Sequence, residues 1–169
     1  MMMLDVVRLL LFPALMAFAA SSDLFTMTIS NRVCLALTGG FFVLALIMGM
    51  SAGDILWHTG AGAMMLTITF GFFAFGWIGG GDAKLAAATA LWLGFDHLFE
   101  YAVYASIFGG ILTLAILKFR VLPLPQLLAR QAWLLRLHQS NGGVPYGIAL
   151  AAAALVVYPH TAWMQALTL

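Results

Sequence analysis

Long apolar runs separated by short polar stretches extend along almost the whole chain. Residues 33–50 contain no charged side chain, and residues 55–78 contain one titratable side chain, that of His58. A run of about 18 or more apolar residues is long enough to cross the roughly 30 Å of bilayer hydrocarbon as a helix. We therefore expect membrane-spanning helices, and the pattern predicts about six of them, over residues 4–20, 33–50, 55–78, 85–95, 101–117 and 145–158.

The fourth predicted helix is short for a membrane span. Residues 85–95 cover only about half of the hydrocarbon thickness at 1.5 Å per residue. This segment therefore needs the polar residues 82–84 and 96–100 at its two ends, or a locally thinned and wet region beside it.

The stretch from residue 118 to residue 143 is more polar and is interrupted by prolines. Within it, Pro125 to Leu137 intersperses leucines and Trp133 with Arg130 and Arg136, a pattern that suits a helix lying along the membrane interface. A solvated connector is the alternative. The fold class predicted is thus all-α: a polytopic membrane protein with about six transmembrane helices and one cytoplasmic interfacial helix, forming a single domain over residues 1–169.

The composition supports a membrane protein and excludes several other classes. Hydrophobic residues make up 64% of the chain and charged residues 8%, against roughly 25% charged residues in soluble domains. A net charge of +1 leaves no basic face for nucleic acid. The single cysteine, Cys34, excludes an intrachain disulfide and a paired-cysteine zinc site. The four histidines are scattered without metal-ligand spacing, so neither a metal nor another cofactor is expected.

The tryptophans follow the predicted helix ends. This placement is typical of an aromatic belt at the two membrane interfaces. The tryptophans concerned are Trp57, Trp92, Trp133 and Trp163.

The charged residues divide unevenly between the two sides of the predicted bundle. Six spans place the loops after helices one, three and five on one side and both termini on the other. Of the seven basic residues, only Arg8 falls with the termini. By the positive-inside rule the loops after helices one, three and five are cytoplasmic and both termini are periplasmic. The six basic residues on the cytoplasmic side are Arg32, Lys84, Lys118, Arg120, Arg130 and Arg136.

Two acids remain on the cytoplasmic side after this division, and each lies at the end of an apolar helix. They are Asp23 and Asp82, whereas Asp5, Asp54, Asp96 and Glu100 fall on the opposite side. Like charges held close together disfavour double ionisation, so such a pair shares one proton. An aspartic peptidase needs that state: one carboxylate takes a proton from water while the other, protonated, polarises the scissile carbonyl. The alternative is that each acid only caps a helix.

Asp82 follows a glycine run that allows a tight turn and a close approach of neighbouring segments. The run Gly79-Gly80-Gly81-Asp82, continued by Ala83-Lys84-Leu85, resembles the Gly-x-Gly-Asp motif of type IV prepilin peptidases. Ser22-Asp23 followed by Ile29-Ser30-Asn31-Arg32 resembles the family's first motif, with Ser30 where the family usually has proline. Val144-Pro145-Tyr146-Gly147 is similar to the start of the family's last helix.

The resemblance implies an aspartic-type endopeptidase with Asp23 and Asp82 as catalytic residues and with Gly79, Gly81 and Lys84 in supporting positions. Bifunctional members carry a methyltransferase domain with paired Cys-x-x-Cys motifs, for which this chain has neither the cysteines nor the room. The chain therefore resembles the short, peptidase-only CpaA/TadV type associated with Flp (tight-adherence) pili. Its implied partners are the lipid bilayer of the bacterial inner membrane and a prepilin with a basic leader, cut after a glycine at the cytoplasmic face. The oligomeric state is left open.

Two other interpretations are weighed against this one. Presenilin-type and signal-peptide-peptidase-type proteases pair Gly-x-Gly-Asp with a Tyr-Asp on an earlier helix, and this chain contains no Tyr-Asp. A small transporter or a pilus assembly subunit could instead use the two acids to move a proton or a cation. Such a protein would place its acids nearer the middle of the membrane.

Overall fold

The computed structural model describes residues 2–140 and 142–165, and all regular structure among them is helical. This confirms the all-α prediction. The extent of the predicted single domain, residues 1–169, stays a prediction, because residues 1, 141 and 166–169 lie outside the described residues. The helices are α1 (Met2–Thr26), α2 (Asn31–Ile47), α3 (Ala52–Ala74), α4 (Gly80–Val121), α5 (Gln126–Ala129), α6 (Ala132–His138), α7 (Tyr146–Val157) and α8 (Ala162–Gln165), with a 3-10 turn at Tyr158–His160 between the last two.

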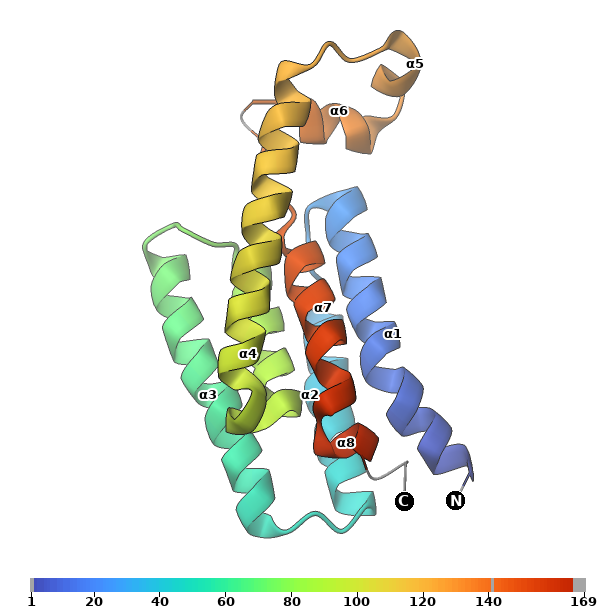
Figure 1. The fold of residues 1–169 in the computed structure, drawn as a ribbon, viewed down its shortest axis with the longest axis vertical. Helices are drawn as coiled ribbons and strands as arrows, with labels where there is room; N and C mark the ends of the chain where they lie inside the picture. The colour runs from blue at the N-terminus through green and yellow to red at the C-terminus, as the bar shows by residue number, and fades with distance from the viewer. Residues whose placement is uncertain (1, 141, 166–169) are drawn as a thin grey trace.

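α4 is a helical hairpin rather than one continuous rod. Its backbone is non-helical at Gly94, where φ is 68° and ψ is −179°, a region essentially restricted to glycine. Figure 1 shows α4 doubling back, with its second half returning beside its first. Asp82 and Ser106 accordingly line one pocket, although 24 residues of straight helix would separate them by about 36 Å. The break separates the segments predicted as two helices, 85–95 and 101–117.

Two side chains from other elements cap the helix that ends at this break. The carbonyl oxygen of Leu91 lies 2.8 Å from Nδ1 of His58. The carbonyl oxygen of Trp92 accepts a hydrogen bond of 2.9 Å from Nε1 of Trp163. A helix end leaves its last carbonyls without intrahelical partners, and these contacts supply partners in an apolar interior.

The prediction of an interfacial aromatic belt is wrong for two of the four tryptophans. Trp92 is 0% exposed and Trp163 is 2% exposed. Nε1 of Trp92 donates to the carbonyl of Leu37 at 2.9 Å, and its ring packs against Phe12 with 5.2 Å between centroids. These tryptophans therefore belong to the core, where the hydrogen bond of each buried indole N–H offsets the cost of removing it from water.

The helix ends are arranged in the alternation that the sequence predicts. In Figure 1 the start of α1, the connection between α2 and α3, and α8 lie at one end of the bundle. The connections after α1 and α3, together with α5 and α6, lie at the other end. Among the described residues, three helical segments are long and apolar enough to cross a membrane: Val6–Thr26, Ala52–Ala74 and Gly80–Val121. The number of spans, six, stays a prediction, since α2 and α7 are shorter and α4 folds back.

The predicted interfacial helix, 125–137, is divided into α5 and α6, and α6 docks onto the bundle. The side chain of Arg120 at the end of α4 donates to the carbonyls of Leu137, Gly142 and Gly143 at 2.7–2.9 Å. Arg136 donates to the carbonyl of Phe25 at 3.0 Å, and Trp133 packs edge-on against the Phe25 ring. These contacts place α6 over the ends of α1 and α4.

Candidate active site

Asp23 lies inside a helix, not after one. The sequence predicts that the first helix ends at Ala20, but α1 continues to Thr26 and Asp23 is 5% exposed in its last turns. Its Oδ2 accepts a hydrogen bond of 2.7 Å from the backbone N–H of Gly147. Gly147 is the second residue of α7, and the first N–H groups of a helix have no partner within it. Asp23 therefore caps α7 from another helix, where the positive end of the helix dipole favours a carboxylate.

Gly147 leaves room for this contact. A Cβ added at residue 147 would lie 2.8 Å from Oδ2 of Asp23 and 2.9 Å from Cδ1 of Ile29. Real Cβ atoms do not approach other atoms this closely. A glycine at this position is thus required for α7 to approach both the carboxylate and the connection between α1 and α2.

Asp82 lies in the first turn of α4, directly after the glycine run. Its Oδ2 accepts a hydrogen bond of 3.2 Å from the backbone N–H of Gly79, so it does cap its own helix, as the alternative interpretation predicts. A Cβ on Gly79 would lie 2.8 Å from the same oxygen. The carboxyl is half-buried, and it also lines a pocket of about 250 Å³ between α3, α4 and α7. Although Asp82 caps its own helix, part of its carboxyl group therefore remains accessible from this pocket.

The structure brings the two acids to the same end of the bundle. Ile29, in the connection between α1 and α2, lies against Gly147, which binds Asp23, and against Gly81, which precedes Asp82. A Cβ on Gly81 would be 3.1 Å from Ile29 Cβ. Asp23 and Asp82 are close enough to interact electrostatically. Asp23 and Asp82, which are 59 positions apart in the sequence, therefore lie in the same region of the structure.

Lys84 contacts α2. Its Nζ donates a hydrogen bond of 2.9 Å to Oδ1 of Asn31, the first residue of that helix. Lys84 and Asn31 also line a pocket with Cys34 and Leu66. The side chain therefore ties the start of α4 to the start of α2, and any role in orienting a carboxylate stays a prediction.

Sequence reasoning missed two tyrosines in the wall beside Asp82. Tyr101 and Tyr146 line the same pocket as Asp82. The hydroxyl of Tyr146 lies 3.0 Å from that of Thr113 on the second half of α4. Tyr146 belongs to the run that resembles the family's last helix, which was a usable signal. The sequence contains no such signal for Tyr101, because only the reversal at Gly94 returns this residue to the level of Asp82.

This arrangement supports acid–base chemistry at a single bond. Two neighbouring carboxyl groups that share one proton contain both a base and an acid. The pocket beside Asp82 is mostly apolar and has a few polar groups, as expected of a site that orients a substrate.

Comparison with known proteins gives the family of the chain. The type IV leader peptidase family matches residues 10–114, which are 105 of the 169 residues and include both Asp23 and Asp82. Neither the curated proteins nor the solved structures yield a match. Family membership implies a peptidase. Because the match covers more than half of the sequence and contains both acidic motifs, the chain belongs to the type IV leader peptidase family.

Proposed function

We propose that this protein is an aspartic endopeptidase that removes the leader peptide of type IV prepilins of the Flp type. The main observation behind this proposal is the position of Asp23 on α1 and Asp82 on α4. Both lie near Ile29 and are close enough to interact electrostatically. Family membership supports a peptidase. The Flp-type substrate comes from the resemblance to the short, peptidase-only members.

In the proposed reaction the two carboxyl groups act together on one water molecule. The ionised carboxylate accepts a proton from water, and the resulting hydroxide adds to the scissile carbonyl carbon. The other carboxyl group donates its proton to the carbonyl oxygen, so that a neutral tetrahedral diol forms. Collapse of the diol breaks the C–N bond: the first carboxyl group returns its proton to the leaving amine, and the second, now ionised, takes the proton from one diol hydroxyl as the carbonyl reforms. No covalent intermediate with the protein is required.

The charge distribution supports cleavage at the cytoplasmic face of the bacterial inner membrane. The elements that surround the two acids carry Arg32, Lys84, Arg120 and Arg136, whereas Arg8 lies in the half of α1 that points to the other end. The positive-inside rule assigns the basic end to the cytoplasm. Both termini are then periplasmic, and the leader is cut before the apolar part of the pilin leaves the membrane.

The test is co-expression with a Flp-type prepilin, followed by gel analysis and mass spectrometry of the new amino terminus. We expect the unmodified chain to release the leader after a glycine. Asp23→Asn and Asp82→Asn should each slow release at least about 100-fold, since each removes one partner of the acid–base pair. Asp96→Asn is the matched control, because Asp96 is exposed near the Gly94 bend, and it should cleave normally.

The outcomes separate this proposal from a transporter or an assembly subunit. Complete leader release by either Asp23→Asn or Asp82→Asn, at normal protein levels in the membrane, would exclude the acid pair. A transporter or assembly subunit predicts no change in prepilin size with any variant.

A further inference from the structure

A groove runs along the face between α3 and the second half of α4. The pocket of about 250 Å³ that contains Asp82 adjoins a second pocket of about 420 Å³, and the two share Met65, Thr69, Phe72 and Ala102. We call the combined hollow the α3–α4 groove. One end lies at Asp82, and the other lies near the Gly94 bend, where Phe95 and Phe99 line it. Phe99 is 82% exposed and Ile68 is 45% exposed, so the groove is open along its side.

The α4 wall of this groove contains small residues between larger ones. Ala102 and Ser106 are exposed and lie four positions apart, on one face of the helix. Small residues at this spacing allow a second helix to approach closely inside a membrane. From Phe95 to Ser106 the α4 wall extends over about 16 Å, which is the length of about 11 helical residues.

The wall also contains polar groups that a lipid chain cannot satisfy. The hydroxyl of Tyr101 is buried, with the residue 1% exposed, and makes no hydrogen bond of normal geometry with any residue that the structure describes. Thr89, its neighbour, directs its own hydroxyl to Sδ of Met16 at 3.8 Å. Both Tyr101 and the carboxyl of Asp82 line this one pocket. Hydrocarbon offers no donors or acceptors, so these groups indicate an occupant with polar backbone at the Asp82 end and apolar side chains beyond it.

We infer that the α3–α4 groove binds the apolar helix of the chain that is cleaved, with the start of that helix at Tyr101 and Asp82. This inference rests on the proposed function. A helix begins with four N–H groups that lack partners within it, and the residues before it have unpaired carbonyls. The Tyr101 hydroxyl can accept a hydrogen bond from one of these N–H groups or donate one to one of these carbonyls. Tyr101 is thus a positioning residue that holds the backbone next to the scissile bond at Asp82.

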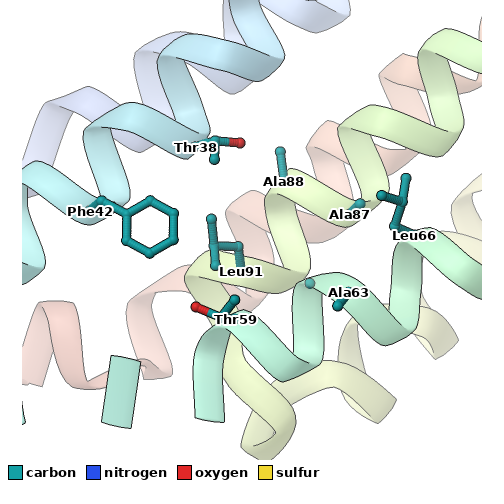
Figure 2. A pocket seen from close by; sticks show the side chains of 9 residues that line it. Thr38, Phe42, Thr59, Ala63, Leu66, Ala87, Ala88 and Leu91 are labelled. Carbon is teal, nitrogen blue, oxygen red and sulfur yellow. The ribbon is translucent and has the colours of Figure 1, made fainter. Parts of the chain in front are cut away.

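A second groove, on the opposite side of α3, supplies the control. Figure 2 shows this pocket of about 210 Å³, with Thr38 and Phe42 on one side, Thr59, Ala63 and Leu66 on the other, and Ala87, Ala88 and Leu91 of α4 at its floor. It is as apolar as the first groove, and none of the described residues that line it is an acid. Ala63 is exposed there, as Ser106 is in the α3–α4 groove.

The first experiment fills each groove with a large side chain. Ser106→Trp should lower the rate of leader release at least tenfold, whereas Ala63→Trp should leave it within about twofold of the unmodified chain. A photo-crosslinking amino acid at position 106 or 63, in the Asp82→Asn background, reports binding without cleavage. We expect the prepilin to crosslink from position 106 and not from position 63.

The second experiment isolates the Tyr101 hydroxyl. Tyr101→Phe keeps the ring and removes only the hydroxyl, which makes no hydrogen bond of normal geometry with any described residue, so its thermal unfolding should be unchanged or slightly raised. Its kcat/KM for leader release should nevertheless fall at least tenfold. A residue with a purely structural role would lose stability and activity together.

These results distinguish failure of the inference from failure of the proposed function. Normal cleavage by both Ser106→Trp and Tyr101→Phe, or crosslinking from position 63 alone, would overturn the groove assignment and leave the peptidase proposal standing. If the unmodified chain released no leader, the peptidase proposal would fail. Crosslinking from position 106 would then still decide whether the groove binds an apolar helix.

Discussion

At the scale of single residues, the site depends on glycines, which have no side chain, as much as on the two acids. Gly79 leaves space for the Asp82 carboxyl to reach back to the backbone, and Gly147 leaves space for α7 to reach Asp23. Both contacts join a carboxyl oxygen to a backbone N–H, and such a hydrogen bond is charge-assisted and stronger when the carboxyl group is ionised. The glycines therefore set the positions of the two acids.

Gly147→Ala should damage the site through geometry alone. The added Cβ would meet Oδ2 of Asp23 at 2.8 Å and Cδ1 of Ile29 at 2.9 Å, so α7 or the carboxylate must move. We expect leader release to fall at least about tenfold and stability to fall by about 1–3 kcal/mol, the usual cost of overpacking. The measurements are the cleavage rate with a prepilin and thermal unfolding in detergent.

Gly143→Ala is the matched control for this substitution. A Cβ at residue 143 would have no atom within 4 Å, so both activity and stability should stay near those of the unmodified chain. Equal behaviour of the two variants would show that α7 tolerates a shift from Asp23 and Ile29.

At the scale of elements, the reversal of α4 determines which residues can meet. Residues 80–93 form a helix of about 21 Å, shorter than the hydrocarbon layer, and Gly94 then turns the chain back along α3 and α7. His58 and Trp163 supply partners for the carbonyls that the break exposes. This reversal brings Tyr101 and Ser106 into the same pocket as Asp82.

Gly94→Ala should destabilise the hairpin. With φ at 68° and ψ at −179° the residue occupies a region that side chains avoid, and a Cβ would lie 3.0 Å from the His58 ring. We expect a loss of about 1–3 kcal/mol, measured by thermal unfolding in detergent. Gly110→Ala is the control, since residue 110 is helical and a Cβ there would meet nothing within 4 Å. A loss no larger than that of Gly110→Ala would contradict a strained backbone at Gly94.

At the scale of the whole molecule, the alternation of helix ends collects six of the seven basic residues and both candidate acids at one end. α6 adds to this end, because Arg120 and Arg136 bind it to α4 and α1 through backbone carbonyls. A membrane potential and an asymmetric lipid surface then act on an end that is chemically distinct from the other. The arrangement suits a site that meets its substrate from one side only.

Reporter fusions along the chain test this orientation. Fusions within residues 27–30, 75–79 and 122–125 should report the cytoplasm, and a fusion within residues 48–51 should report the periplasm, as the positive-inside rule predicts. The measurement is paired alkaline phosphatase and fluorescent protein activity at each position. Opposite locations for residues 27–30 and 75–79 would separate Asp23 from Asp82 and remove the proposed acid pair.

Much of this molecule follows from local properties of the sequence. Helical structure follows from apolar runs, because a backbone in lipid must satisfy its own hydrogen bonds. The two acids were recognisable because ionised groups at the ends of such runs are costly and few. The glycine run before Asp82 predicted close packing at that turn, as the contacts of Gly79 and Gly81 show.

Only the tertiary structure decided which of these features meet. The contact between Asp23 and Gly147 joins residues 124 positions apart, and no periodicity in the sequence encodes it. The burial of Trp92 and Trp163 and the return of Tyr101 to the level of Asp82 likewise depend on the reversal at Gly94. Hydrophobic patterns specify that a segment is helical and buried in lipid or protein, because burial depends on the amount of apolar surface. Which partner each face meets depends on shape and on unpaired backbone groups, and these exist only once the helices are packed.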